Sequence, residues 1–258
     1  MRNVFFVKAF LLLISVLLAS CDQSPSGGRQ AGLNPLLPDF SSFIDVKQKK
    51  QAFFDFMKPL IDQANQAVMA ERQQVLAWQQ QDALNDDDRQ ALQQLAKKYR
   101  VDAETPEQQL QQLEQRIHTI PPSLVMAQAA NESAWGTSRF ALEGNNLFGQ
   151  WCFSKGCGIV PSSRNSGANH EVARFDSPYE SVASYIRNLN SHPSYQQLRT
   201  LRAQELSDQA YSTGSNLAGG LLKYSERGEE YVKEIRAMIR HNKLAKFDLG
   251  QDPQPNQG

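Results

Sequence analysis

A single acidic residue lies in an otherwise small and apolar stretch near the middle of the chain. The segment from Leu124 to Trp135 reads LVMAQAANESAW, and Glu132 is its one ionisable residue. Gln128 stands four positions earlier, so both side chains share one face of a helix. Burial and the negative end of the helix dipole both favour a neutral carboxyl group. A carboxylic acid that keeps its proton near neutral pH can protonate a glycosidic oxygen as a general acid.

The same pattern also fits a structural carboxylate on the surface or capping a loop, because perturbed carboxylates often have structural roles. Other chemistries find less support in the sequence. The four histidines (His118, His170, His192 and His241) are scattered, and HExxH, GxSxG, GxGxxG and phosphate-loop motifs are absent from the sequence. We therefore expect no metal and no cofactor.

Two motifs around the acid resemble a known enzyme family. QAANESAWG at 128–136 and NNLFG at 145–149 are similar to the core signature of glycoside hydrolase family 73. These enzymes are endo-β-N-acetylglucosaminidases of bacterial cell walls. The longer runs at 131–153, 170–195 and 224–232 resemble the Bax-type branch of the family more closely. The resemblance covers residues 120–244, about half of the chain.

The resemblance implies catalytic roles for three residues. Glu132 matches the general acid of the family. Tyr224, with Tyr231, matches a tyrosine that lies near this acid and places water or the sugar's acetamido group; a buried structural tyrosine is the alternative. The family often carries a second acid on a β-lobe, and Glu171 is the one acid at 152–175. If no carboxylate approaches the bond, the substrate's own N-acetyl group can act as the nucleophile.

Four further residues are predicted to bind substrate: Gln128, Trp135, Asn146 and Phe148. Trp135 could stack on a sugar ring or pack the end of its own helix. Asn145 and Asn146 also read as a turn, because asparagine tolerates left-handed backbone geometry.

The implied function is cleavage of the β-1,4 bond after N-acetylglucosamine in the glycan strands of peptidoglycan. The implied fold is mostly α, a lysozyme-like α+β domain with a small β-lobe, preceded by an N-terminal helical region. Two alternatives remain: a lytic transglycosylase, which also uses one helix-borne glutamate, and a non-catalytic wall-binding lipoprotein. The sequence leaves the protein partners unknown.

The first residues indicate export and lipid attachment. Arg2 and Lys8 precede an apolar run at 9–19 that is short for a membrane span and typical of a secretory signal. Leu-Ala-Ser-Cys, ending at Cys21, resembles a bacterial lipobox, in which the cysteine is lipidated. An ordinary signal peptide is the alternative. We expect a periplasmic lipoprotein anchored through Cys21, with Asp22 slightly favouring the inner membrane.

The remaining cysteines and the charge balance narrow the possibilities further. Cys152 and Cys157 are close enough to form a disulfide in an oxidising periplasm, with two free thiols as the alternative. A zinc site would need further ligands nearby. The chain has 27 basic and 27 acidic residues, and removal of residues 1–20 takes away two basic ones, which leaves 25 against 27. This balance gives no reason to expect nucleic-acid binding.

The elements that must position the acid follow from periodicity and composition. Apolar spacing predicts helices over 45–81, with a kink or a new start at Pro59, and then over 87–99 and 106–117. Asp86 or Asp87 is expected near the N-cap of the second helix, and Thr105 is expected to cap the third, with Pro106 first. A further helix is predicted from Pro122 through Trp135, and another begins at Ser177 with Pro178 first. The predicted division is therefore a signal peptide (1–20), a lipid-anchored tether (21–40), a helical region (41–119), a glucosaminidase domain (120–246) and a flexible tail (247–258).

Overall fold

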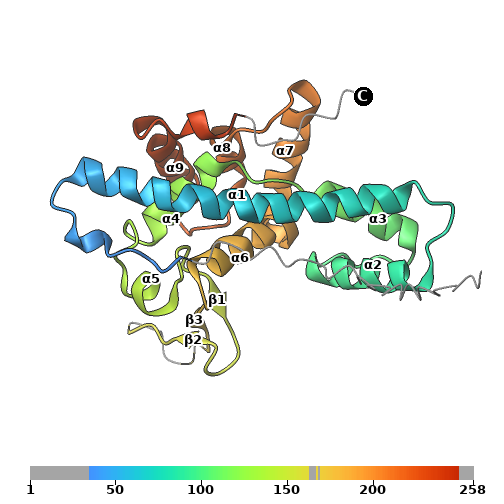
Figure 1. Ribbon diagram of the computed structural model, residues 1–258, viewed down its shortest axis with the longest axis horizontal. Coiled ribbons are helices and arrows are strands. Elements are labelled where there is room, and N and C mark those ends of the chain that lie inside the picture. The colour runs from blue at the N-terminus through green and yellow to red at the C-terminus, as the bar shows by residue number, and fades with distance from the viewer. Residues whose placement is uncertain (1–34, 163–166, 168, 250–258) are drawn as a thin grey trace, which may run out of the picture. The chain divides into compact units, whose positions relative to one another are not determined.

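The computed structural model describes residues 35–162, 167 and 169–249, and this part of the chain is mostly helical. A short 3-10 helix, η1 (Phe40–Ser42), leads into the long helix α1 (Val46–Gln79). Figure 1 shows α2 (Asp86–Lys98) and α3 (Pro106–Arg116) beside the C-terminal half of α1. The predicted signal segment and Cys21 lie outside the described residues.

Helix α1 continues through Pro59, so of the two predicted outcomes, a kink or a new helix start, the new start does not occur. Proline removes one backbone hydrogen bond and crowds the preceding turn, which normally costs several kcal/mol. Met57, Leu60 and Ile61, on either side of the proline, are completely buried. Their packing against the rest of the fold holds the helix together where local propensity alone would end it.

Side-chain caps define the beginnings of the N-terminal helices. The Asp45 carboxylate accepts a hydrogen bond of 2.7 Å from the backbone N–H of Gln48 at the start of α1. Thr105 caps α3 as predicted, with Pro106 in the first turn. The cap of α2 is Asn85, one residue before the aspartates that the sequence suggested, because its amide oxygen reaches the N–H of Asp88.

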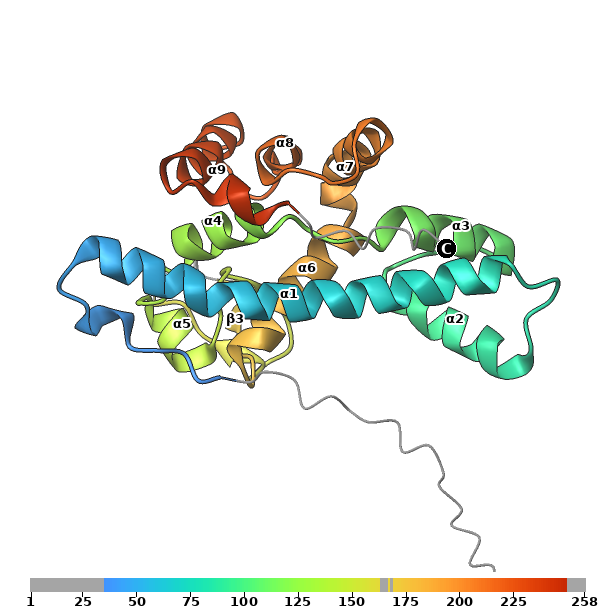
Figure 2. The same ribbon diagram turned by 45° about the horizontal axis from the view of Figure 1, so that its top comes forward.

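The candidate acid lies on α4 (Pro122–Glu132), the helix at the centre of the fold. Every residue of α4 from Pro122 to Ala130 is buried. This helix contacts α1 on one side and three C-terminal elements on the other, as Figure 2 shows. Those elements are α8 (Gly214–Leu217), α9 (Glu229–His241) and η4 (Leu244–Phe247).

The other described helices complete the helical part. They are α5 (Arg139–Gly144), α6 (Pro178–Ser191), η2 (Pro193–Tyr195), α7 (Gln196–Asp208) and η3 (Ala218–Gly220). The capping prediction for α6 is confirmed, because the Ser177 hydroxyl accepts a bond of 3.2 Å from the N–H of Glu180.

A small antiparallel sheet forms the predicted β-lobe. Its strands are β1 (Trp151–Cys152), β2 (Gly158–Ile159) and β3 (Glu171–Ala173), in the order β1-β3-β2. Trp151 pairs with Val172, and Gly158 pairs with Ala173. The predicted class, mostly α with a small β-lobe and an N-terminal helical region, is confirmed.

The helical region and the following domain share one hydrophobic core rather than two. Asn65 on α1 joins them through a reciprocal pair of hydrogen bonds with the backbone of Ile120, at 2.9 and 3.0 Å. The described residues from 35 to 249 accordingly belong to one compact unit. Among the described helices, none is long and apolar enough to cross a bilayer.

The structure moves two predicted boundaries. Phe40, the last residue of the predicted tether, is 1% exposed and belongs to the core. Phe247 and Asp248 were assigned to the flexible tail, yet Phe247 packs on the core and Asp248 is buried. The Asp248 carboxylate accepts bonds from the N–H and hydroxyl of Ser123 and from the N–H of Gly214, which ties the first turns of α4 and α8 together.

Candidate active site

Glu132 is the last residue of α4, and its side chain is half-buried. The hydroxyl of Tyr231, on α9, donates a hydrogen bond of 2.7 Å to Glu132 Oε1. The Asn131 amide donates a longer bond of 3.3 Å to the same oxygen. One carboxyl oxygen is thus oriented by the protein, while the side chain remains accessible to solvent.

A chain of hydrogen bonds holds the Tyr231 hydroxyl in place beside the carboxylate of Glu132. Gln128, completely buried one turn earlier on α4, donates from Nε2 to the Tyr231 hydroxyl at 2.8 Å. The hydroxyl of Tyr185, on α6, donates to Gln128 Oε1. The series therefore runs from Tyr185 on α6 to Gln128 on α4, then to Tyr231 on α9 and back to Glu132 on α4. Each residue donates its hydrogen bond to the next one in this order.

A left-handed turn directly after Glu132 ends α4 earlier than the sequence predicted. Ala134, Trp135 and Gly136 all have positive φ, at 51°, 61° and 77°. A side chain at Gly136 is excluded, because its Cβ would lie 2.6 Å from the ring of Phe40. The Ser133 hydroxyl closes the turn by accepting a 2.8 Å bond from the N–H of Gly136.

Aromatic rings surround the hydrogen-bond series. Tyr224 stacks on Tyr231 with ring centroids 5.4 Å apart, and Phe148 stacks on Tyr185 at 4.0 Å. Burial, with a further contribution from the nearby charge of Glu132, raises the pKa of Tyr185, Tyr224 and Tyr231 above the ordinary phenol value. These phenols therefore stay protonated and act as hydrogen-bond donors at every physiological pH.

Tyr224, the tyrosine predicted to be catalytic, stacks on Tyr231, and it is Tyr231 that contacts Glu132. The Tyr224 hydroxyl donates to the backbone carbonyl of Phe148 at 2.9 Å. Tyr231 makes the contact with the acid. The sequence placed both tyrosines near the site, yet which hydroxyl reaches the carboxylate depends on how α9 packs against α4.

Three of the residues predicted to bind substrate are buried and make contacts within the protein. Gln128, Asn146 and Phe148 are at most 2% exposed. The Asn146 side chain donates to the carbonyls of Gln150 and Ala173 at 2.9 and 2.8 Å and so fastens the turn to β3. Their polar or aromatic character serves internal contacts beneath the acid, which sequence patterns do not distinguish from ligand contacts.

Asn145 and Trp135 have packing roles. Asn145 adopts the left-handed conformation that ends α5, as its residue type predicts. The Trp135 ring lies edge-on to Phe53 and Phe54 at 5.7 and 5.4 Å, with the ammonium group of Lys50 4.9 Å from its centroid. Trp135 thus joins the end of α4 to α1, the packing alternative that the sequence allowed.

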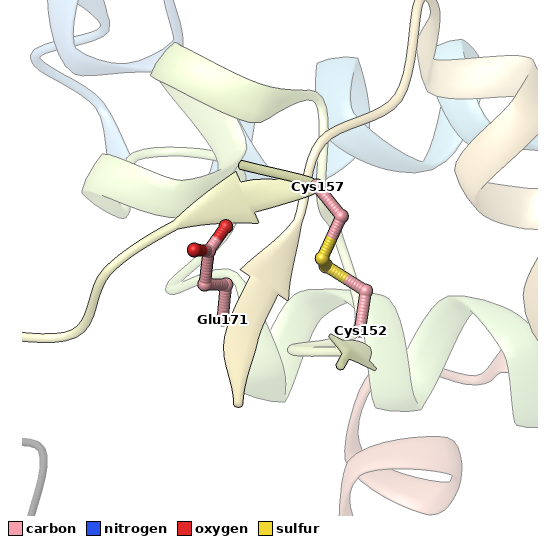
Figure 3. A group of neighbouring side chains, drawn as sticks. All are labelled: Cys152, Cys157 and Glu171. Atoms are coloured by element: carbon pink, nitrogen blue, oxygen red, sulfur yellow. A yellow bond between two sulfur atoms is a disulfide. The ribbon is translucent and has the colours of Figure 1, made fainter. Parts of the chain in front are cut away.

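Glu171, the predicted second acid, holds the β-lobe together. Its buried carboxylate accepts hydrogen bonds from the N–H groups of Gly156 and Gly158, at 3.0 and 2.8 Å. Figure 3 shows it on β3 near the disulfide between Cys152 and Cys157, whose sulfur atoms are 1.97 Å apart. The three side chains have ligand spacing for a metal, but sulfurs joined in a disulfide are not the thiolates that bind one.

We expect Glu171→Gln to retain turnover within about threefold of wild type and to lose about 1 kcal/mol of stability, because a neutral amide oxygen is a weaker acceptor for the two backbone N–H groups. Activity on purified glycan and urea unfolding would measure the two effects. An unchanged pH profile is part of the expectation. A fall in turnover of 100-fold or more, with loss of one limb of the pH profile, would show that Glu171 takes part in catalysis.

The structure thus defines a helical protein with one partly exposed, hydrogen-bonded carboxylate at the end of its central helix. Residues 107–244 match the glucosaminidase family, described as mannosyl-glycoprotein endo-beta-N-acetylglucosaminidase. Protein bax of Escherichia coli strain K12 is 33% identical over 216 residues, which are 83% of this chain and 77% of that protein. The catalytic domain of the autolysin Auto of Listeria monocytogenes aligns over 69% of this chain and 97% of its own, with 18% identity and a TM-score of 0.40.

The chain belongs to the glucosaminidase family and is a Bax-type member of it, as its motifs predicted. The family consists of glycosidases, and the matched segment contains α4, the β-lobe and α9. The carboxylate, its tyrosine partner and the lobe therefore all lie within the part of the chain that defines the family.

Proposed function

We propose that this protein cuts the glycan strands of peptidoglycan at the β-1,4 bond after N-acetylglucosamine, with Glu132 as the general acid. The observation that carries the proposal is the arrangement at this residue. A half-buried carboxylate at the end of a buried helix has one oxygen held by the Tyr231 hydroxyl. Membership of a glycosidase family supports the reaction class.

The hydrogen bond from Tyr231 distinguishes the two carboxyl oxygens. Oε1 accepts from Tyr231 and Asn131, so Oε2 is the oxygen that donates the proton in this mechanism. Oε2 then faces the glycosidic oxygen and donates to it as the bond breaks and oxocarbenium character develops at the sugar. The leaving sugar departs as an alcohol, and Glu132 becomes a carboxylate that can next deprotonate water.

The second group in this reaction is the substrate's acetamido oxygen. Glu171 is engaged with the backbone of its own lobe. Each N-acetylglucosamine residue carries an acetamido group, and its carbonyl oxygen can attack the anomeric carbon to form a cyclic intermediate. Water opens this intermediate with Glu132 as base, which restores the acid and leaves a reducing end with retained configuration.

Product analysis tests the function directly. Mass spectrometry of defined peptidoglycan after digestion should show fragments that end in reducing N-acetylglucosamine. Fragments with 1,6-anhydro ends would instead identify a lytic transglycosylase, since that reaction captures the cation with an internal hydroxyl. Wall binding without any released fragment would leave a non-catalytic binding protein.

Tyr231→Phe should lower turnover about 10-fold or more while the protein stays folded, because a hydrogen bond to a charged group contributes roughly 1.5–3 kcal/mol. Tyr224→Phe is the matched comparison, because it removes a bond to a backbone carbonyl and should lower turnover less. Equal losses of turnover in the two variants would contradict a positioning role for Tyr231.

The site of action in this proposal is the periplasmic side of a bacterial membrane, with the chain held by lipid on Cys21. The support is the order of features in residues 1–21, where basic residues are followed by an apolar run and then by the lipobox-like sequence that ends at Cys21. Metabolic labelling with a radioactive fatty acid should mark the wild type and leave Cys21→Ala unlabelled.

A further inference from the structure

A hollow lies between the N-terminal end of α1 and the C-terminal end of α9. Its volume is 820 Å³, and Figures 1 and 2 show the two helix ends on the same side of the described fold. Four lysines, Lys47, Lys50, Lys243 and Lys246, line it. We call these lysines, together with Ile44, the basic patch.

The basic patch is locally cationic in a chain with balanced charge. Across 35–162 and 169–249, none of its four lysines forms an ion pair of the kind that joins Lys58 to Asp62 or Lys233 to Glu230. Asp45 is the acid that lines the same hollow, and its carboxylate caps α1. Three net positive charges therefore face solvent here, before His241 at the same rim is counted.

An exposed apolar side chain stands among these cations. Ile44 is completely exposed, and its neighbour Val46 is 65% exposed. Both lie at the start of α1, beside Lys47. Exposed apolar residues next to lysines are typical of surfaces that enter the headgroup layer of a membrane, where the apolar part inserts and the lysines meet anionic lipid.

The position of the patch in the chain favours the same partner. Ile44 is 23 residues after Cys21, from positions 44 and 21. A fully extended segment of this length spans at most about 80 Å. If Cys21 carries lipid, as proposed above, the patch is confined close to the bilayer, and even a weak surface contact is then occupied most of the time.

From the hollow, the charge and the exposed isoleucine we infer that the basic patch docks on the anionic phospholipid surface of the membrane. The acidic groups of cell-wall peptides would satisfy the lysines but offer no apolar layer for Ile44. Docking adds something that a tether cannot provide, namely a fixed orientation. The end of α1 at Ile44 faces the lipid, and the helix leads from there toward α2 and α3.

Vesicle co-sedimentation tests the inference with the chain from residue 33 onward, which forms one compact unit and lacks the lipid site. It should bind vesicles of phosphatidylcholine with phosphatidylglycerol and leave pure phosphatidylcholine vesicles unbound. Each lysine near an anionic surface contributes a factor of roughly five in affinity. Lys47→Glu, Lys243→Glu and Lys246→Glu together should therefore weaken binding by at least about 100-fold, and added salt should weaken wild-type binding.

The control makes the same change in charge elsewhere, with Lys97→Glu, Lys155→Glu and Lys223→Glu, all exposed. This variant should keep most of its vesicle binding.

Ile44→Ser, at a side chain without packing contacts to lose, should weaken binding without changing net charge. Both triple variants should digest soluble glycan like wild type, so failure of this inference is separable from failure of the enzymatic proposal. Equal loss in both triple variants, binding to neutral vesicles, or patch-dependent binding to purified wall in place of vesicles would overturn the inference.

Discussion

Glu132→Gln should reduce the release of glycan fragments from purified peptidoglycan by at least about 100-fold, the lower end of what a general acid contributes. Glutamine keeps the oxygen that accepts from Tyr231 and fills the same space. It has no proton to give to a leaving alcohol at neutral pH. Turnover should therefore collapse while the fold and substrate affinity remain.

Two measurements separate this effect from damage to the fold. Urea unfolding of Glu132→Gln should match wild type to within about 1 kcal/mol, since the exchange leaves the buried part of α4 unchanged. Glu104→Gln makes the same chemical change at an exposed position in the helical region and should digest glycan normally. Full activity of Glu132→Gln would reject the assignment of the acid and with it the proposed mechanism.

Arg202→Met should destabilise the protein by about 3 kcal/mol, because it leaves several buried oxygen atoms without donors. Arg202, on α7, is 2% exposed. Its guanidinium donates to the carbonyls of Gln115 and Arg116 at 3.2 and 2.9 Å and to Asn190 Oδ1 at 2.5 Å. The first two carbonyls belong to the last turn of α3, so one cation caps that helix from a distant part of the chain.

The matched control is Arg187→Met, which removes an exposed guanidinium from α6 and should change stability by less than about 0.5 kcal/mol. Chemical unfolding with a fluorescence signal from the tryptophans would measure both variants. Arg202 also donates to the carbonyls of His118 and Thr119, on the segment that leads into α4. Near-wild-type stability of Arg202→Met would show that the neighbouring backbone finds water or other donors.

Several features of the fold were predictable because they depend on short-range physics. Thr105 and Ser177 are caps in the sequence and in the structure, since a hydroxyl needs to reach an N–H only three residues away. The pattern of alanines and the lone carboxylate located α4, and the asparagine pair located a turn. Pro59 shows the limit of this reasoning, because long-range burial of α1 overrides a strong local signal.

The sequence singles out the candidate acid, but it says less about the residues around it. Glu132 stands out as the one charge in an apolar helix. Tyr185 looked like an ordinary aromatic residue of an amphipathic helix, and Tyr231 was placed near the site without its contact to the acid. Their hydroxyl contacts cross 57 and 99 positions of sequence, to Gln128 and Glu132 respectively. Glu171 looked like a second acid because it is the one carboxylate at 152–175.

By itself the sequence determined the family, the helical character and the position of the candidate acid, because motif spacing and helical periodicity are properties of neighbouring residues. Tertiary structure decided the rest: which tyrosine holds the carboxylate, which polar residues are buried, and where the carboxylate of Glu171 points. The physical reason is that a hydrogen bond depends on the distance between two groups after packing. Only the packing of α4 against α1, α6 and α9 sets those distances.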